Sequence, residues 1–177
     1  MILDFFKTAI GLKKIHRQGW IDKLSITNPE SVADHSYSMA IMGMIISDLE
    51  DYDSEKMMKM ILLHDLAESK IGDYIPGQID SERKNEIENK AFLKILKDLP
   101  DSIIPQYQNI WKEYQKNESP ESQMVHQLDR LEMALQAKTY QDEGHSKEQL
   151  ESFYESAKKE IANPKLKELF MQIMSDK

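Results

Sequence analysis

Residues 62–69 read LLHDLAES, a stretch that places a histidine directly before an aspartate inside an apolar run. Burying an isolated charge costs free energy, so ionisable side chains inside a helical core are usually paired or bind a metal ion. Glu68 follows His64 by four residues and Asp65 by three, which puts its carboxylate over the same side of a helix. The stretch therefore predicts a polar site within a helical core.

The composition around this stretch favours helices. The chain has 177 residues, of which 40% are hydrophobic, enough for one domain with a sizeable core. It contains only six glycines and six prolines, and Leu, Lys, Glu, Met and Ile are plentiful. Without cysteine, disulfides and thiolate metal sites are excluded, which suits a cytoplasmic protein. No apolar run approaches the roughly 20 residues of a membrane helix, and the first residues do not resemble a signal peptide.

The formal net charge of −8 argues against a general nucleic-acid surface, which needs clustered Lys and Arg. A small phosphorylated substrate remains compatible with an acidic chain, because a bound divalent cation can invert the charge locally. The charge therefore favours a small-molecule partner and excludes nucleic acid as a partner.

Turn-forming residues divide the chain into helix-length segments. The interruptions fall at 28–31, 50–54, 72–81, 98–102, 116–122, 142–146 and 163–164. We predict an all-α, single-domain bundle over 1–177 with seven or eight helices. A metal-site core spans about 28–143, and two amphipathic helices over 146–177 complete the bundle.

Three segments carry ionisable residues toward the predicted interior. SVAD at 31–34 fits a capping box that starts a helix. At helical spacing, one face of that helix carries a stripe that is apolar except for one histidine, which therefore faces inward: Val32, His35, Met39, Met42, Ile46 and Leu49. The next helix has a face made of Met57, Met60, Ile61, His64 and Glu68, with Asp65 beside it. A later stripe consists of Met124, Leu128, Leu131 and Leu135, with Asp129 beside it.

Two inward histidines and two inward aspartates match the nitrogen and oxygen ligands of a divalent ion. Adjacent helical residues point about 100° apart, so His64 and Asp65 can share an ion only at a helix end or in a cleft between helices. Such a set leaves coordination positions for water and a substrate oxygen, as hydrolysis by a metal-activated water requires.

Each residue alone has a simpler explanation. A lone inward histidine such as His35 is more often a hydrogen-bonded core residue than a ligand. Asp129 could pair with Arg130 or Lys138, and Glu68 could pair with Lys70 on the surface. The metal-site prediction depends on the ordered combination of His35, the doublet and Asp129.

This combination resembles the HD superfamily of metal-dependent phosphohydrolases, named for the His-Asp doublet. Longer stretches look like the HD-domain 5'-deoxynucleotidase family: RQGWIDKLSITNPESVADHSYSMAIMGMII (17–46), LLHDLAESKIGDYIPG (62–77), QLDRLEMALQA (127–137) and YQDEG (140–144). The similarity covers roughly residues 5–145, with the motifs in order. It implies the HD-type helical fold and a homodimer.

The resemblance also implies roles for individual residues. The metal ligands it implies are His35, His64, Asp65 and Asp129. It implies that Glu68 assists the catalytic water and that Asp73 helps with protonation or substrate placement. It favours Mn²⁺ or Co²⁺, although the residue types also suit Mg²⁺, Zn²⁺, Fe²⁺ or Ni²⁺.

The family uses an Arg and a Trp at the end of its first helix, for which Arg17 and Trp20 are the candidates. An Arg fork suits a phosphate dianion, and an indole can shape a sugar pocket that excludes a 2'-hydroxyl. The two residues between Arg17 and Trp20 depart from members in which the pair is adjacent. It therefore stays open whether Lys13, Lys14 or Arg17 meets the phosphate, and Trp20 could equally fill the core.

The resulting hypothesis is a phosphomonoesterase that converts deoxyribonucleoside 5'-monophosphates to deoxynucleosides and phosphate. One alternative keeps the metal site but acts on nucleoside triphosphates or cyclic nucleotides. A second alternative, from another class, is a non-catalytic helical binding protein with a structural metal.

Overall fold

The computed structural model describes residues 1–74 and 80–176, and this part of the chain is helical throughout. Five residues of the predicted 72–81 loop, 75–79, lie outside the described residues. The described elements are α1 (Ile2–Gly11), the 3₁₀ helix η1 (Leu12–Lys14), α2 (Gln18–Leu24), α3 (Val32–Glu50), α4 (Ser54–Leu63), α5 (Glu68–Ile71), α6 (Ser81–Leu96), α7 (Ile104–Lys116), α8 (Pro120–Asp142), α9 (Lys147–Glu160) and α10 (Pro164–Ser175). The all-α prediction is confirmed.

Ten α-helices in the described residues exceed the seven or eight predicted. One reason is that the N-terminal segment divides into α1, η1 and α2 rather than forming one helix. Another is that α5 is a single turn of four residues, separated from α4 by an irregular turn. The remaining helices begin and end close to the predicted interruptions.

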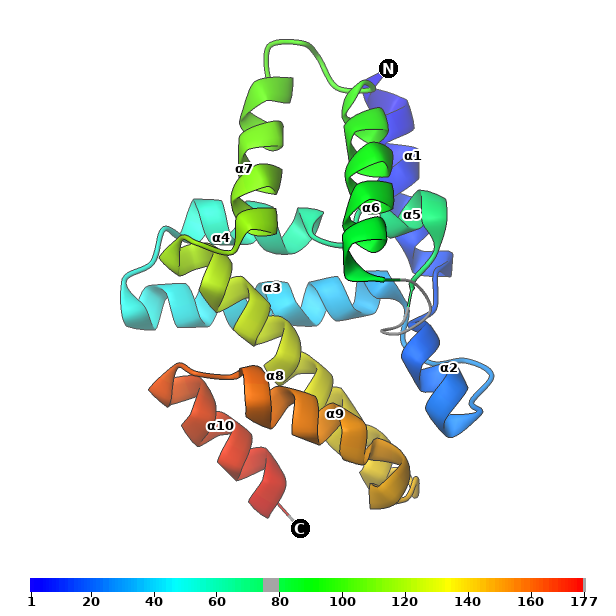
Figure 1. Ribbon diagram of the computed structural model, residues 1–177, viewed down its shortest axis with the longest axis vertical. Coiled ribbons are helices and arrows are strands. Elements are labelled where there is room, and N and C mark those ends of the chain that lie inside the picture. The colour runs from blue at the N-terminus through cyan, green and yellow to red at the C-terminus, as the bar shows by residue number, and fades with distance from the viewer. Residues whose placement is uncertain (75–79, 177) are drawn as a thin grey trace.

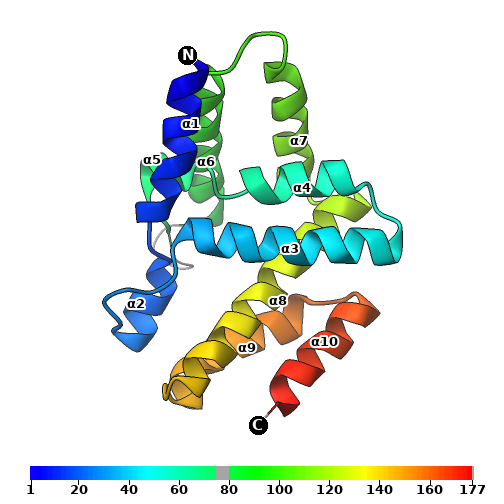
Figure 2. The ribbon, with the colours of Figure 1, turned by 180° about the vertical axis from the view of Figure 1, so that it is seen from behind.

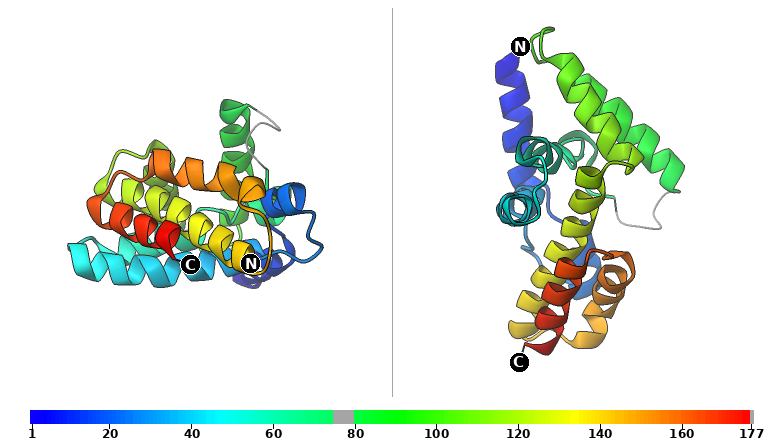
Figure 3. Two further views of the ribbon diagram at one scale, coloured as in Figure 1. Left: turned by 90° about the horizontal axis from the view of Figure 1, so that it is seen from below. Right: turned by 90° about the vertical axis from the view of Figure 1, so that its left-hand side faces the viewer.

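Helices α3 and α4 lie side by side in the middle of the molecule, and α8 crosses both of them (Figures 1 and 2). On one side of this pair stand α1, α6 and α7, and on the other side α9 and α10 pack against the second half of α8 (Figure 1). Figure 3 shows the N-terminus and the C-terminus at opposite ends of the long axis. Helix α8 thus connects the two ends of the molecule.

Local side chains begin the helices as the sequence predicts. Ser31 and Asp34 form the capping box: Ser31 N donates to Asp34 Oδ2 at 2.9 Å, and Asp34 N donates to Ser31 Oγ at 3.2 Å. Proline occupies the first turn of α7, α8 and α10, where a missing backbone N–H costs nothing. These starts are local, so they could be predicted without tertiary information.

The predicted apolar stripes are wrong at two positions, where the side chains are exposed and not buried. Leu49 is 61% exposed, because the 3.5-residue spacing of that stripe drifts by about 20° per heptad around a 3.6-residue helix. Leu135 is 47% exposed, since the buried face of α8 at that level carries Ala134 and Ala137. The stripes are correct near the site and fail toward the far ends of the helices.

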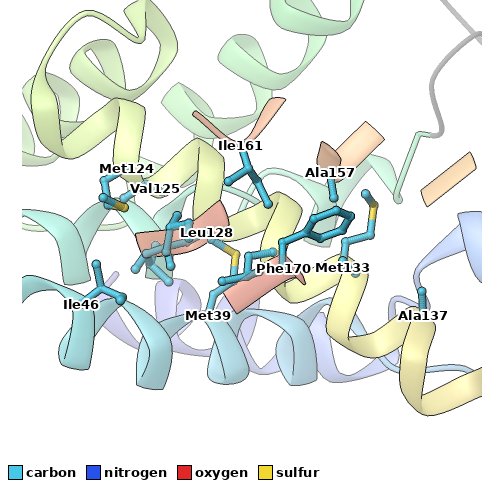
Figure 4. Close-up of a cluster of buried hydrophobic side chains, with 14 of the residues drawn as sticks. Met39, Ile46, Met124, Val125, Leu128, Met133, Ala137, Ala157, Ile161 and Phe170 are labelled. Carbon is cyan, nitrogen blue, oxygen red and sulfur yellow. The ribbon is translucent and has the colours of Figure 1, made fainter. Parts of the chain in front are cut away.

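The buried side chains form two clusters. The larger one joins α2, α3, α4, α8, α9 and α10 and includes Met39, Ile61 and Leu128. Figure 4 shows part of this cluster. The smaller one joins η1, the start of α3, the end of α4, α6 and α7, and includes Val32 and Leu63. Both clusters include residues of α3 and α4: Met39 and Ile61 belong to the larger one, Val32 and Leu63 to the smaller one.

Gly43 lets α3 and α4 approach closely. A Cβ atom at this position would lie 2.3 Å from Cδ1 of Ile61 and 3.7 Å from Cδ1 of Leu128. Ile61 is fully buried, so its side chain has little room to move. The glycine therefore sets the spacing of the two helices that carry the histidines.

Within the described residues, none of the helices has both the length and the apolarity needed to cross a membrane.

Candidate metal centre

A short antiparallel bridge places Arg17 beside the start of α3. His16 and Ser31 form this isolated bridge, and Arg17 N donates to the carbonyl oxygen of Glu30 at 3.1 Å. The pairing holds the residues before α2 against the residues that cap α3. Arg17 and His35, which are 18 positions apart, are brought to one place in this way.

His35 lies in the first turns of α3 and is fully buried. Its Nδ1 is 2.6 Å from Oε2 of Glu132, on α8. Its Nε2 faces two aspartates, at 3.3 Å from Asp129 Oδ1 and 3.8 Å from Asp65 Oδ2. One nitrogen of the ring is therefore engaged by a carboxylate behind it, while the other points at the aspartates.

The His-Asp doublet lies at the end of a helix and not inside one. Helix α4 ends at Leu63, and His64 is its C-cap, so the residues that follow turn away from the helix axis. His64 Nδ1 is 2.6 Å from the carbonyl oxygen of Ile61, and His64 Nε2 is 3.0 Å from Asp65 Oδ2. The turn lets two adjacent side chains face the same point, which a regular helix would prevent.

Asp129 completes the cluster from the middle of α8. Its Oδ1 faces His35, and its Oδ2 lies 3.5 Å from Arg130 Nη1. The pairing with Arg130 considered from the sequence is therefore present, but it uses only the outer oxygen. The inner oxygen stays directed at the histidines.

Whether the site suits a cation can be judged from its buried polar atoms that lack hydrogen-bond partners. In the described residues four such atoms find no hydrogen-bond partner: His35 Nε2, His64 Nε2, Glu68 Oε2 and Asp129 Oδ1. Ligating atoms of His35, His64 and Asp129 all lie within 4.8 Å of one another. Unpaired buried polar groups cost about 1–3 kcal/mol each, and two imidazoles with carboxylates are a usual donor set for divalent ions. The residues therefore fit a divalent cation.

The electrostatics of the cluster favour positive charge. Burial and Arg17 lower the pKa of His35, but Asp129 and Glu132 outweigh them and raise it to about 9. Burial raises the pKa of Asp129, yet the nearby His35 and the charges of Arg130 and Arg17 bring it well below its usual range. The Asp129 carboxylate thus favours its ionised form, and the position between Asp129 and His35 favours positive charge.

Arg17 lies over the same carboxylates and is 16% exposed. Its Nη1 is 3.3 Å from Asp65 Oδ2, and its Nη2 is 3.9 Å from Asp129 Oδ1. Burial lowers the pKa of Arg17, but the surrounding carboxylates raise it above its usual range. Lys13 and Lys14, the other two cations considered from the sequence, are exposed in η1. Arg17 is the cation of the three that lies in the cluster.

Glu68 and Asp73 flank Arg17. Glu68 is 3% exposed, and its pKa is raised well above the usual range by burial and by Asp65 and Asp73, against Arg17 and Lys84. Asp73 Oδ2 accepts a hydrogen bond at 2.8 Å from Gln18 N, at the start of α2. The two acids therefore occupy different positions, one buried in the cluster and one at its edge.

Trp20 has no free face. Its side chain is 1% exposed and lies against Phe153 and Tyr140, with ring centroids 4.1 and 5.2 Å away. Its Nε1 donates to Glu30 Oε1 at 2.7 Å. In this conformation the indole fills the core, which matches the second interpretation of its sequence position.

Several site residues were missed from the sequence. Glu132, three residues after Asp129, could have been found because i and i+3 share a helix face. Nothing in the sequence signals Glu30, whose pKa rises to about 7 mainly through burial and the neighbouring Glu132. Lys84 and Glu88, a pair 3.4 Å apart on α6, reach the site only through the fold.

His126 lies one turn before Asp129 on α8, but its ring is engaged by another residue. Its Nε2 lies 3.1 Å from the carbonyl oxygen of Tyr114, and its ring stacks on the Tyr114 ring at 4.3 Å. The Tyr114 ring in turn contacts His64 edge-on, with centroids 5.9 Å apart. Tyr114 thus forms an aromatic wall of the site that the sequence did not reveal.

Comparison with known proteins identifies the family of the chain. A family model described as HD domain matches residues 10–169. The chain is 36% identical to the 5'-deoxynucleotidase HDDC2 of Dictyostelium discoideum over 99% of this chain and 97% of that protein. It is 33% identical to the 5'-deoxynucleotidase HDDC2 of Homo sapiens, over 99% of this chain and 86% of that protein.

A solved structure of a conserved hypothetical protein from Pyrococcus furiosus has the same fold. The TM-score is 0.76 and the sequences are 33% identical, over 97% of this chain and 98% of that chain. An HD domain implies a divalent metal, and the His and Asp side chains described above could hold one. The chain therefore belongs to the HD-domain family, as the resemblance of its sequence to metal-dependent phosphohydrolases implies.

Proposed function

We propose that the protein is a metal-dependent phosphohydrolase that releases phosphate from deoxyribonucleoside 5'-monophosphates. The observation that carries the proposal is the set of unpaired buried atoms of His35, His64 and Asp129, gathered within 4.8 Å beside the guanidinium of Arg17. The relatives named 5'-deoxynucleotidase support the substrate class. A cation site next to an arginine suits the charge and geometry of a phosphate monoester.

In this proposal one divalent ion would be held by two imidazoles, His35 and His64, and two carboxylates, Asp65 and Asp129. Such an ion neutralises charge on phosphoryl oxygens and lowers the pKa of a water molecule. Mn²⁺ and Co²⁺ are the ions we expect from the family resemblance, because mixed nitrogen and oxygen ligands do not by themselves select one divalent ion. Mg²⁺, Zn²⁺, Fe²⁺ and Ni²⁺ are compatible with the same donors.

Glu68 is the proposed proton acceptor. Its Oε2 is buried without a partner, and its carboxylate is close enough to Asp65 and Arg17 for their charges to change its pKa. A carboxylate that lies beside the proposed metal site can take a proton from the attacking water. Asp73, anchored on Gln18 N at the edge of the cluster, is the proposed group that orients the leaving 5'-oxygen or protonates it.

Arg17 is the proposed phosphate ligand. Its guanidinium offers two N–H groups on one edge, which suit two oxygens of a phosphate dianion. The charges of Asp65 and Asp129 hold it over the cluster before substrate arrives. It needs little rearrangement to bind an oxyanion there.

A panel of nucleotides tests the function. Ribo- and deoxynucleoside 5'-monophosphates, deoxynucleoside triphosphates and cyclic nucleotides are each incubated with Mn²⁺, Co²⁺, Mg²⁺ or EDTA, and phosphate, pyrophosphate and triphosphate are measured. We expect phosphate from the deoxymonophosphates with Mn²⁺ or Co²⁺, and none with EDTA. Release only from triphosphates or cyclic nucleotides would replace the proposed substrate. No metal-dependent turnover on any nucleotide would favour a binding protein.

The Arg17→Met variant is expected to lose about 10- to 100-fold in kcat/KM, the worth of a charged hydrogen bond or two. Its affinity for the metal ion should stay equal or increase, because a positive charge beside the ion is removed. Steady-state kinetics and calorimetric titration with Mn²⁺ measure the two effects.

Lys13→Met and Lys14→Met are the matched controls for this variant, since both lysines are exposed in η1. Each should keep the parent kcat/KM. A large loss in either control, with Arg17→Met unaffected, would transfer the phosphate role to that lysine.

Two further expectations concern the molecule in the cell. We expect a cytoplasmic protein and a homodimer. The outer face of α3 supports a dimer, because it exposes apolar side chains four residues apart: Tyr37, Ile41, Ile45 and Leu49. A monomeric mass by sedimentation at micromolar concentration would contradict the dimer.

A further inference from the structure

A second carboxylate network lies behind His35, on the side away from the metal position. Glu132 is 3% exposed, and its Oε2 is 2.6 Å from His35 Nδ1. Glu132 follows Asp129 by three residues on α8, so one helix face supplies carboxylates to both sides of the imidazole. Charge on Glu132 therefore acts on His35 directly.

The contact decides which nitrogen of His35 is free. A carboxylate oxygen accepts the hydrogen bond from the ring, so in the neutral imidazole it holds the ring hydrogen on Nδ1 and leaves the lone pair on Nε2. His64 reaches the same state by another route, since its Nδ1 faces the carbonyl oxygen of Ile61. In the neutral rings, both Nε2 atoms therefore offer a lone pair toward the same point, where a metal ion can bind.

Glu30 is the second carboxylate of this network. Oxygens of Glu30 and Glu132 lie within 4.8 Å of one another and of a His35 nitrogen. Glu30 Oε1 accepts a hydrogen bond from Trp20 Nε1 at 2.7 Å, and Glu30 N donates to Tyr140 Oη at 3.0 Å. The indole thus fixes the position of Glu30 and leaves Glu132 as the partner of His35.

We propose that Glu132 is the positioning residue of His35, and that Trp20 supports it by holding Glu30 in the same buried network. The inference rests on the metal role proposed for His35. It gives Trp20 a function that does not require contact with the substrate. It also explains why Glu132 is buried and Glu30 half-buried at a place that the proposed reaction does not use.

The Glu132→Gln variant tests the inference. A carboxamide can donate as well as accept, so it no longer selects the Nδ1–H form of His35. We expect its affinity for Mn²⁺, measured by calorimetry, to fall about 10- to 100-fold, as for other groups that orient a metal ligand. Glu121→Gln is the matched control on α8, because Glu121 pairs with Lys56 at 2.8 Å in the first turn. The control should bind Mn²⁺ as the parent does.

A measurement on the unmodified protein keeps the test independent of folding. In the Zn²⁺-loaded parent, ¹⁵N NMR of the imidazoles should show His35 protonated at Nδ1, with a strongly downfield proton from the short hydrogen bond. The signal is assigned by its loss in His35→Gln. A His35 ring protonated at Nε2, or parent-like Mn²⁺ affinity in a folded Glu132→Gln variant, would overturn the inference.

Trp20→Phe keeps an aromatic ring and removes only the N–H. We expect Mn²⁺ affinity to fall roughly 2- to 10-fold, the worth of one hydrogen bond, with the ratio of deoxy to ribo turnover unchanged. A changed ratio at parent-like affinity would assign Trp20 to the sugar and remove it from the network. Failure of the proposed function is distinguishable, because the parent itself would then release no phosphate or bind no Mn²⁺.

Discussion

The Asp129→Ala variant is expected to lose both metal binding and phosphate release. Asp129 is the proposed metal ligand that comes from α8, and its Oδ1 is buried without a hydrogen-bond partner in the described residues. Replacing a residue that only orients a ligand costs about 10- to 100-fold, so losing a ligand should cost on the order of 1,000-fold or more in kcat/KM. Metal content after dialysis and turnover of a deoxynucleoside monophosphate measure the two losses.

Asp142→Ala is the matched control, since Asp142 ends the same helix and its side chain is 59% exposed. This variant should retain metal and activity. Thermal unfolding in EDTA would test whether both variants are folded. Parent-like turnover in an Asp129→Ala protein that contains no metal would rule out the proposed mechanism.

The Glu68→Gln variant is expected to keep the metal and lose turnover. Proton transfer by a positioned carboxylate contributes about 10²- to 10⁴-fold, and a carboxamide cannot accept the proton. We therefore expect kcat to fall by that factor while Mn²⁺ affinity stays within the range of the parent. This combination separates a proton acceptor from a metal ligand, for which both quantities would fall.

Glu55→Gln is the control for this change, because the side chain of Glu55 is 78% exposed near the start of α4. It should leave kcat unchanged. Loss of Mn²⁺ binding in Glu68→Gln would make Glu68 a ligand, and an unchanged kcat would remove it from the proton transfer.

The same variant should change how stability depends on pH in the metal-free protein. Burial and the charges of Asp65 and Asp73 raise the pKa of Glu68 well above its usual range. The folded state then binds more protons than the unfolded state, so stability decreases as the pH rises from the unfolded pKa through the folded one. Glu68→Gln should remove that decrease. Melting temperatures in EDTA at increasing pH, compared with the parent, measure it.

Much of the fold could be predicted because its signals are local. The capping box of Ser31 and Asp34 and the interruptions near Ser54 and Pro120 depend on residues within one or two turns, and all appear where predicted. The spacing of apolar residues is also a local signal, but a prediction of burial from it assumes that other helices cover the whole length of the stripe. The exposed Leu49 shows where that assumption ends.

The break after Leu63 could not be predicted in the same way. LLHDLAES contains no proline or glycine, and its residues are compatible with a continued helix. Tertiary contacts favour the break instead, because it lets His64 and Asp65 face one point while Leu63 and Leu66 are buried in the smaller core cluster. Packing outweighed local propensity here.

By itself, the sequence determined that this chain is helical, where most helices begin, and that His35, His64, Asp65 and Asp129 are the set to examine as a metal site. Only the tertiary structure decided that Arg17 rather than Lys13 or Lys14 lies over that set, that Trp20 is enclosed, and that Glu132 supports His35 from behind. The reason is physical: helix starts and faces depend on neighbours within a few residues, whereas burial and charge pairing depend on which helices meet.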